Sequence, residues 1–413
     1  MFIFDKIYIE KMVNIMNRSI IKKLKIILLI CLLILIGELI YGFYQMKYNA
    51  KKSIYFEGIN SLIITDKYYA TVGSNNDNDN HYEKAKVSKY NSKKEKTFEK
   101  LYNVGFNSAF FGVISDSDNL VVVGNYEKNE KEHDNHYRRG LIVKYDNEGN
   151  VLFDDDYKKL DNSKFTSIKQ YNSDYIVTGQ SIYSSTRLGN KEGGAVLVRY
   201  DKELNTIWSK TIGDNKSALF NDCVIVNNYI YAVGVDNYNV GIIVKYDMDG
   251  NFINKAEYNH TDNIGFTSIV SDSNYIYVSG SKVIDDDNTD ALIVKYDNEL
   301  NYISEVSYDN IGDMRFNKII IDSHNNLVTI GSIASYSKEK GSSYDYDSII
   351  AKYSTDLEKI KVVVYGDKQD DYFTDIREND EKYIVVGYSS YEDGSYMSKI
   401  ISYSMALKVL EVN

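Results

Sequence analysis

Residues 194–201 read Gly-Ala-Val-Leu-Val-Arg-Tyr-Asp, and variants of this stretch recur at nearly regular intervals along the 413-residue chain. Each variant is a short, mainly apolar run that ends in a tyrosine. The tyrosines that close the seven copies are Tyr90, Tyr145, Tyr200, Tyr246, Tyr296, Tyr353 and Tyr403. The chain is therefore built from seven repeats.

Three spacings within the repeat are nearly constant and one is not. Most repeat tyrosines are followed by an aromatic residue twelve positions later, a phenylalanine eight positions further and a glycine fourteen or fifteen beyond that. From this glycine to the next repeat tyrosine the distance ranges from twelve residues, Gly234 to Tyr246, to twenty-two, Gly331 to Tyr353. One connection in each repeat is therefore free to change in length.

Each repeat contains four short runs that are rich in β-branched and aromatic residues. In the fifth repeat these runs are residues 266–270, 275–279, 291–296 and 303–308, and turn-forming residues separate them. No stretch after residue 54 has helical periodicity over the length that a helix needs. Seven four-stranded units of roughly fifty residues are typical of a β-propeller. A solenoid would also satisfy the repeat, but so long a period favours radial closure.

We therefore predict an all-β chain: a seven-bladed β-propeller of four-stranded antiparallel blades over residues 55–413, preceded by one N-terminal transmembrane helix. In this arrangement the phenylalanine lies on the innermost strand, the glycine ends the second strand and the repeat tyrosine ends the third. The variable connection joins the second and third strands. Residues 406–412 are expected to form the outer strand of the last blade.

The N-terminal region contains one apolar run, residues 26–44, interrupted only by Gly37 and Glu38. At about 1.5 Å per residue, such a helix has roughly the length of the 30 Å hydrocarbon core of a bilayer. Four cations precede the run, and the positive-inside rule places that side in the cytoplasm. The expected organisation is a short cytoplasmic segment (residues 1–25), a membrane anchor (26–44), a linker (45–54) and an extracellular propeller (55–413).

Two alternatives concern this apolar run. A cleaved signal peptide would need small residues at its cleavage site, and no such site follows the run. A lipoprotein would use Cys31, but this cysteine lies inside the apolar run rather than at its end. We favour an uncleaved single-pass anchor in the cell membrane.

The charge of the chain limits the partners of the predicted propeller. The formal net charge is −11, and residues 1–52 contain nine Lys or Arg against three Asp or Glu, so the remainder has a charge of −17. A strongly acidic domain disfavours nucleic acid and anionic lipid as partners. The chain has only two cysteines, so no disulfide is expected. Abundant Ile, Lys, Asn and Tyr without proline suggest a low-GC Gram-positive source.

The repeat resembles the bacterial β-propeller repeat proteins of the surface and lipoprotein kind. The resemblance is clearest over residues 193–214 and extends, more weakly, over about residues 55–413. It implies the fold, whereas propellers of this kind serve many functions. The Trp-Asp dipeptide of one propeller class and the paired glycines of the kelch class are missing. Trp208 occurs in one repeat only, which disfavours a quinone-binding propeller.

Several motifs contain metal-ligating residue types, but each has a simpler explanation. His81 and His136 both lie nine residues before a repeat tyrosine, which shared ancestry of the first two repeats explains as well as metal binding does. The segments 146–150 and 247–251 have the composition of hairpin turns and lack the distal glutamate of a calcium loop. Residues 285–290 form a denser acidic cluster that a solvated turn explains. We assign no metal and no cofactor.

The longest variable connections, in repeats two, three and six, are the predicted binding site. A loop has little reason to lengthen for folding alone, because extra residues add closure entropy without burying core. Exposed tyrosines and cations suit an extracellular protein or glycan partner. The candidate residues are His136, Tyr137, Arg138, Arg139, Tyr183, Arg187, Tyr344 and Tyr346. Residues 137–139 are expected to be a positive centre on an acidic domain.

A second candidate site is the central channel, lined by polar residues of the innermost strands. Asp222, Lys318 and Asp375 are the charged candidates, and the two aspartates replace a serine found in other repeats. If these side chains converged in one pocket, an extracellular hydrolase or lyase acting on glycans would be the alternative to a binding or scaffolding module. No catalytic residue is assigned, and the sequence does not indicate an oligomeric state.

Overall fold

A computed structural model describes residues 58–77, 82–102, 104–105, 107–129, 136–159, 162–181, 193–213, 218–236, 240–258, 264–285, 288–308, 312–336, 344–366, 370–390 and 396–412. These residues belong to one compact unit. The predicted anchor, residues 26–44, and linker, residues 45–54, lie outside the described residues. Among the described residues, no helix is long and apolar enough to span a bilayer.

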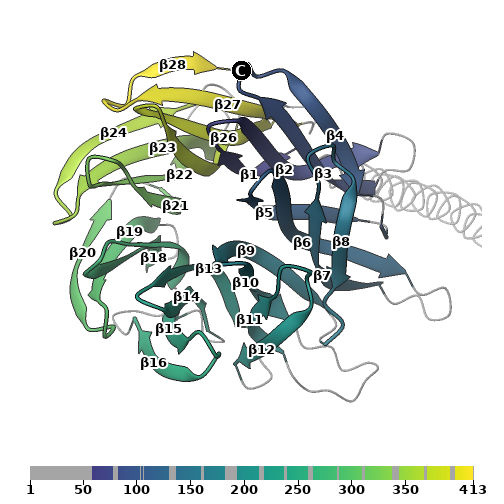
Figure 1. The fold of residues 1–413 in the computed structure, drawn as a ribbon. Helices are drawn as coiled ribbons and strands as arrows, with labels where there is room; N and C mark the ends of the chain where they lie inside the picture. Colours follow the sequence, from purple (N-terminus) through teal and green to yellow (C-terminus); the bar gives the residue numbers. More distant parts are fainter. Residues whose placement is uncertain are drawn as a thin grey trace, which may run out of the picture. The chain divides into compact units, whose positions relative to one another are not determined.

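The described strands form seven four-stranded antiparallel sheets arranged around a central channel (Figure 1). The predicted seven-bladed β-propeller is therefore confirmed. In each sheet the four strands are consecutive in sequence, and the first strand of each is the innermost.

The first four blades have the following strands. Blade 1 contains β1 (Gly58–Ile64), β2 (Tyr68–Asp77), β3 (Tyr82–Asn91) and β4 (Lys96–Tyr102). Blade 2 contains β5 (Ser108–Asp116), β6 (Asn119–Asn129), β7 (His136–Tyr145) and β8 (Val151–Asp156). Blade 3 contains β9 (Ser163–Tyr171), β10 (Asp174–Ser181), β11 (Gly194–Tyr200) and β12 (Thr206–Ile212). Blade 4 contains β13 (Leu219–Val226), β14 (Tyr229–Val235), β15 (Gly241–Asp247) and β16 (Phe252–Glu257).

The last three blades follow the same plan. Blade 5 contains β17 (Ile264–Ser271), β18 (Tyr275–Asp285), β19 (Asn288–Asp297) and β20 (Tyr302–Tyr308). Blade 6 contains β21 (Met314–Ile321), β22 (Asn326–Tyr336), β23 (Tyr344–Ser354) and β24 (Lys359–Tyr365). Blade 7 contains β25 (Asp371–Asn379), β26 (Lys382–Ser390), β27 (Tyr396–Ser404) and β28 (Val409–Val412). The predicted outer strand of the last blade is confirmed, but it begins at Val409 because Leu407 lies in the preceding turn.

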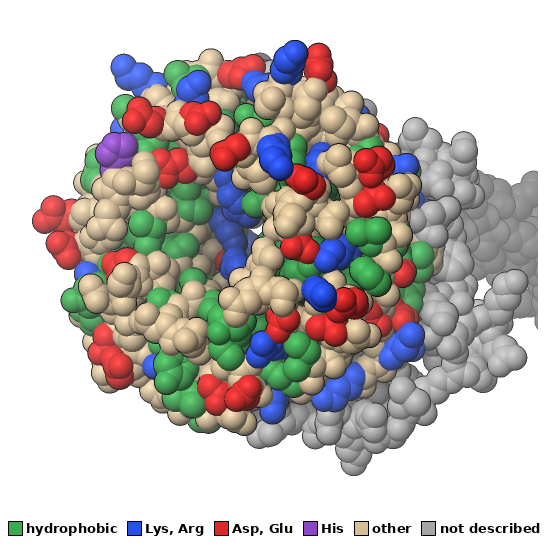
Figure 2. Space-filling model, in the orientation of Figure 1, with side chains coloured by type: hydrophobic (Ala, Val, Ile, Leu, Met, Phe, Trp, Pro, Cys, Tyr) green, Lys and Arg blue, Asp and Glu red, His purple; other side chains and the backbone are tan. Residues whose placement is uncertain are grey.

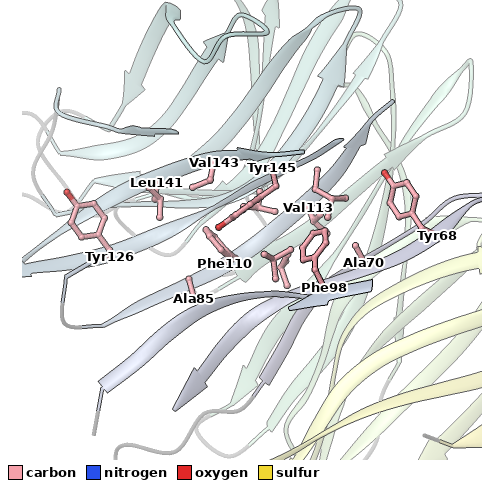
Figure 3. Close-up of a cluster of buried hydrophobic side chains, with 14 residues drawn as sticks. Tyr68, Ala70, Ala85, Phe98, Phe110, Val113, Tyr126, Leu141, Val143 and Tyr145 are labelled. Carbon is pink, nitrogen blue, oxygen red and sulfur yellow. The ribbon is translucent and has the colours of Figure 1, made fainter. Parts of the chain in front are cut away.

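The hydrophobic core lies between neighbouring blades. Figure 3 shows the cluster in which Ala70 and Phe98 of blade 1 pack against Phe110, Val113 and Tyr145 of blade 2. Phe110 is fully buried, and each such side chain contributes about 1.5–3 kcal/mol relative to an exposed one. Each blade therefore covers the apolar face of the next.

Aromatic contacts between blades account for two of the fixed spacings. Four of the six residues that lie twelve positions after a repeat tyrosine contact the phenylalanine of the following blade, with ring centroids 5.4–6.0 Å apart. These pairs are Tyr102–Phe110, Tyr157–Phe165, Tyr258–Phe266 and Tyr365–Phe373. The aromatic ladder thus fixes the length of the blade-to-blade connection.

The repeat glycines do not end the second strands, which corrects the prediction. Every second strand continues past its glycine, for example β6 past Gly124. Each innermost strand contains a β-bulge beside this glycine, as the register shift between Phe110 and Gly112 shows for blade 2. A Cβ on Gly124 would lie 1.9 Å from the carbonyl oxygen of Ala109, and the other six repeat glycines meet the same obstacle at 1.8–2.1 Å. The glycine is required because the bulge brings one backbone against another.

A cation joins each of the first six blades to the next. The residue before the repeat tyrosine reaches the turn between the third and fourth strands of the following blade. The contacts are Lys89 to Asn147, Lys144 to Lys202, Arg199 to Met248, Lys245 to Asn298, Lys295 to Thr355 and Lys352 to Met405, at 2.7–3.3 Å. In blade 7 this position is Ser402, so the junction between blades 7 and 1 lacks the cation.

The junction between the last and first blades is held mainly from the channel side, and one exposed ion pair, Lys94 to Glu411 at 2.6 Å, joins its outer edge. Among the described strands none is exchanged between these two blades, because β1 to β4 and β25 to β28 each form their own sheet. Ser61 Oγ and the backbone N–H of Leu62 donate to Asp375 Oδ2 at 2.7 and 2.9 Å. A small apolar cluster of Ile59, Leu62 and Val386 packs beside these bonds. The ring therefore closes through side chains of its innermost strands.

Candidate functional site

The bulges aim one side chain per blade into the channel. In six blades this residue donates a hydrogen bond to a backbone carbonyl of the next innermost strand. The donors are Asn60, Thr166, Asn221, Thr267, Asn317 and Thr374, and the bonds measure 2.6–3.1 Å. Phe111 occupies the position in blade 2, and the Lys164 ammonium lies 3.8 Å from the centroid of its ring. A polar ring with one aromatic member thus surrounds the channel.

Beside this ring the channel contains a buried ionic network centred on Asp222. Lys169 Nζ and Ser167 Oγ lie 2.9 and 2.6 Å from Asp222 Oδ1, and Lys318 Nζ and Ser268 Oγ lie 2.7 and 2.8 Å from Oδ2. Although burial opposes ionisation, the two lysines hold the pKa of Asp222 well below its usual range. The carboxylate is therefore ionised near neutral pH, and both of its oxygens accept hydrogen bonds from protein donors.

A second carboxylate, Asp375, is bound in the same manner. Its Oδ1 accepts hydrogen bonds from the Arg377 guanidinium at 2.6 Å and from the Ile376 N–H at 2.9 Å. Its Oδ2 accepts the two bonds from blade 1 described above. Asp222, Lys318 and Asp375 therefore line one cavity of about 140 Å³, so the predicted channel residues do converge.

The convergence does not create an acid–base pair. A general acid must hold a proton near neutral pH, and a general base must have a free lone pair directed at the substrate. The side chains of both aspartates are only 2–3% exposed, and their oxygens accept hydrogen bonds from protein donors. The neighbouring Cys223 is buried, and burial raises the pKa of its thiol to about 12, so it is no nucleophile. The two carboxylates hold cations in place and close the ring.

Lys169 and Arg377 are part of the network but were not among the predicted residues. Lys169 lies four residues after Phe165, and Arg377 lies four residues after Phe373. At the equivalent position of the innermost strand the other five repeats have Ile or Val. A cation at an aliphatic repeat position is the signal that would have identified them.

The predicted binding residues lie on hairpin strands or outside the described residues. His136 and Tyr137 belong to β7 and Tyr344 to β23, whereas Tyr183 and Arg187 lie outside the described residues. Arg138 and Arg139 belong to β7 as well. Arg138 pairs with Glu127 at 3.2 Å and Arg139 with Asp156 at 3.0 Å. Each arginine thus pairs with a carboxylate of its own blade, and Asp156 also pairs with Lys158 at 3.0 Å. The positive centre at residues 137–139 stays a prediction.

Tyr346 belongs to a row of four tyrosines on the face that holds the hairpins between second and third strands. Ring centroids are 5.6 Å apart for Tyr346 and Tyr372, 5.2 Å for Tyr372 and Tyr388, and 5.4 Å for Tyr388 and Tyr396. All four are partly exposed. Burial raises the pKa of Tyr388 to about 12, so its hydroxyl stays protonated near neutral pH. We call these four residues the tyrosine row.

The metal-like motifs behave as turns where they are described. Asp247 accepts hydrogen bonds from the Asp249 and Asn251 N–H groups and from the Asn251 side chain at 2.8–2.9 Å. Asp146 does the same in its own turn. Within the described part of the chain, no group of three His, Cys, Asp or Glu residues could hold a metal ion. His81 lies outside that part.

Comparison with known proteins supports the fold and nothing finer. No family model matches the chain, and no curated protein sequence matches it. Its fold is similar to a chain in the complex of KlAtg21 with the coiled-coil of AgAtg16, at 10% identity and a TM-score of 0.52, over 86% of this chain and 99% of that one. It is similar to Pyrococcus horikoshii acylaminoacyl peptidase at 9% identity and a TM-score of 0.51, over 87% of this chain.

The chain spans about half of that peptidase, 53% of its length. A third similar fold is the β-propeller domain of the Trilobed protease from Pyrococcus furiosus, at 9% identity and a TM-score of 0.48, over 83% of this chain and 92% of that one. The fold and the site together define a seven-bladed β-propeller, a class that commonly provides a protein-binding or scaffolding surface.

Proposed function

We propose that this chain is a binding module that engages an extracellular protein partner through the tyrosine row, and that residues 26–44 tether it to the cell membrane. The observation that carries the proposal is the row itself. Four tyrosines, three from strands of blade 7 and one from blade 6, lie in successive ring contact, two pairs tilted and one edge to face, and remain partly exposed. Tyrosine is enriched at interfaces because it combines apolar area with a polar end and few rotatable bonds.

The surroundings of the tyrosine row favour protein binding over catalysis. The row extends to the first described strand, since a Cβ on Gly58 would lie 3.7 Å from Tyr388 Cδ1. It therefore spans the junction where the ring closes, on a rigid sheet rather than on a loop. The alternative, a glycan-active hydrolase or lyase, would need a carboxylate free to exchange protons, and both channel aspartates are occupied.

A site-specific crosslinker tests the proposed face. Tyr396 is replaced by p-benzoylphenylalanine in whole cells, with the same replacement at Tyr302, a 47% exposed tyrosine on an outer strand, as the matched control. We expect a discrete protein adduct from position 396 and none from 302. Tyr372→Ala should abolish the adduct, whereas Tyr372→Phe should retain it. Equal adducts from both positions would place the interface on the outer rim, and binding to isolated glycans that Tyr372→Ala abolishes would make the partner a glycan.

The proposed tether is tested separately. A protease added to intact cells should remove the domain after Tyr44 and leave a short membrane fragment. Recovery of the whole domain from the medium without protease would show instead that the apolar run is cleaved. The proposal for the tyrosine row does not depend on this result.

A further inference from the structure

The channel cavity has more cations than carboxylates. Lys169, Lys318 and Arg377 line it together with Asp222 and Asp375, which leaves a net charge of +1 in a domain that is acidic as a whole. The remaining lining is mostly Ser, Thr and Asn, and the cavity of about 140 Å³ admits a small ion together with water. Figure 2 shows basic side chains deep in the central hollow.

The carboxylates lie behind the cations rather than beside them. The side chains of Asp222 and Asp375 are 2 and 3% exposed, whereas those of Lys318, Arg377 and Lys169 are 19, 26 and 31% exposed. A species that enters the cavity therefore meets ammonium and guanidinium groups first. The cavity surface is positive even though its ionic network is nearly balanced.

The cations also have donors to spare. Among the described residues, the ammonium groups of Lys169 and Lys318 each contact one acceptor, an oxygen of Asp222, although each carries three N–H bonds. Arg377 uses Nη1 for Asp375 Oδ1 and the Ile376 carbonyl. Burial, with the charges of Lys169 and Arg377, lowers the pKa of Lys318 more than Asp222 and Asp375 raise it. An additional negative charge would therefore be favourable at this position.

The cavity opens toward the hairpin face. A second cavity of about 250 Å³ shares its lining residues Asn60, Phe111, Thr166, Asn221, Thr267 and Asn317 with the first. Lys164 lines only the second cavity and adds a fourth cation at the entrance. The ammonium of Lys164 lies above the ring of Phe111, which is the one residue of the seven bulges without a side-chain hydrogen-bond donor. A path lined by cations thus leads from the hairpin face to the ionic network.

We propose that the channel is a binding site for a small oxyanion, a carboxylate or phosphate group, held by Lys169, Lys318 and Arg377. The group can come from a free ion or from the acidic end of a larger ligand that enters past Lys164. Charge-assisted hydrogen bonds from two ammonium groups and one guanidinium would hold it, with the channel threonines and asparagines and water completing its shell. This site is separate from the tyrosine row and stands independently of the proposed partner.

Titration of the purified full-length chain tests the site. Inorganic phosphate and acetate serve as free ions, and an oligouronide carries the carboxylate on a longer chain, with chloride keeping the ionic strength constant. We expect saturable heat of binding and a rise in melting temperature for at least one probe. Lys318→Met and Lys169→Met should each weaken binding at least tenfold, and Lys318→Arg should retain it.

Controls separate binding from folding. Lys255→Met removes a cation from the outer strand of blade 4 and should bind like wild type. If the oxyanion arrives on a larger ligand, Lys164→Met should weaken the binding of the oligouronide only. If the oxyanion is a free ion, Lys164→Met should leave the binding of all probes unchanged. The absence of saturable binding of every probe to the folded wild-type chain would overturn the proposal. Equal binding by wild type and a folded Lys169→Met/Lys318→Met double variant would overturn it as well.

Discussion

The Thr374 hydroxyl donates a hydrogen bond of 2.6 Å to the carbonyl oxygen of Ile59, and so connects two residues 315 positions apart. The equivalent bond within the ring runs from Thr267 to the Phe316 carbonyl, also at 2.6 Å. The two bonds have the same chemistry but different surroundings. Blades 5 and 6 are also joined by the chain and by the buried Lys295, whereas outside the channel blades 7 and 1 share the exposed Lys94–Glu411 ion pair.

Thr374→Val should loosen the closing junction more than Thr267→Val loosens an internal one. Each substitution removes one partly buried hydrogen bond, which costs about 0.5–1.5 kcal/mol. Only at the closing junction does the loss permit local opening, so amides of β1 and β25 should exchange with solvent faster in Thr374→Val. Hydrogen exchange measured by mass spectrometry reports this difference. Equal protection of β1 in the two variants would show that closure does not depend on the channel-side bonds.

Gly280→Ala should destabilise the fold, whereas Gly265→Ala, in the same blade, should not. A Cβ on Gly280 would lie 2.1 Å from the Gly265 carbonyl oxygen, so the bulge must shift, at a cost of about 1–3 kcal/mol. The nearest atoms to a Cβ on Gly265 are 3.9 Å away. Gly265→Ala should therefore be neutral or add about 0.4–1 kcal/mol by restricting the unfolded chain. Urea unfolding of both variants tests the bulge, and similar midpoints would contradict it.

Asp222→Asn should be among the most destabilising substitutions of a polar residue. It leaves Lys169 and Lys318 near each other without their shared counter-charge, and breaking a buried ion pair in this way costs about 3–5 kcal/mol. The exposed turn residue Asp249 offers a matched control, for which Asp249→Asn should change stability by less than about 0.5 kcal/mol. Equal free energies of unfolding for the two variants would mean that the channel network adds nothing to stability.

The stability of the chain should also depend on Glu83. Burial, and then the charge of Glu127, raise the pKa of Glu83 to about 7, above its ordinary value of 4.5. The folded state therefore binds this proton more tightly than the unfolded state does, and stability falls as pH rises from about 4.5 to about 7. Glu83→Gln should be more stable than wild type at pH 8, by on the order of 1 kcal/mol, and equal to it at pH 4.

Thermal unfolding across this pH range measures the effect of Glu83. Glu148→Gln, at an exposed turn, is the control and should follow the wild-type curve. A Glu83→Gln curve that runs parallel to wild type at every pH would show that this carboxyl does not titrate in the window.

The fold could be predicted because its constraints repeat. Most blades bury a phenylalanine beside an aromatic residue of the preceding blade, and this contact recurs at fixed spacing from Tyr102–Phe110 to Tyr365–Phe373. The same periodicity identifies the repeat glycines, but it does not show why they are needed: the sequence suggests the end of the second strand, and the structure shows a bulge. A bulge is a relation between two strands, and the obstacle at Gly124 is the Ala109 backbone, which has no side-chain signature.

The site could be predicted only in part, because its contacts cross the ring. Asp222 and Asp375 stood out as departures from the repeat, but which cations they meet depends on how seven blades close around the channel. Lys318 reaches Asp222 from two blades away, and Ser61 reaches Asp375 across the closing junction. The carboxylate partners of Arg138 and Arg139 lie on the two strands that flank β7. Which residues face each other there depends on the strand register, and the length of the hairpin does not determine that register.

The closing junction makes the propeller sensitive to mechanical force. Its first strand, β1, is the innermost strand of blade 1, and Ser61 and Leu62 on that strand hold Asp375. Tension applied to the chain from its N-terminal side would therefore reach the channel before it reached any outer strand. None of the described strands is exchanged across this junction, Ser402 supplies no cation, and the Lys94–Glu411 pair at its outer edge is exposed and therefore weak. The ring would therefore part at this junction first, and the channel would respond to the tension.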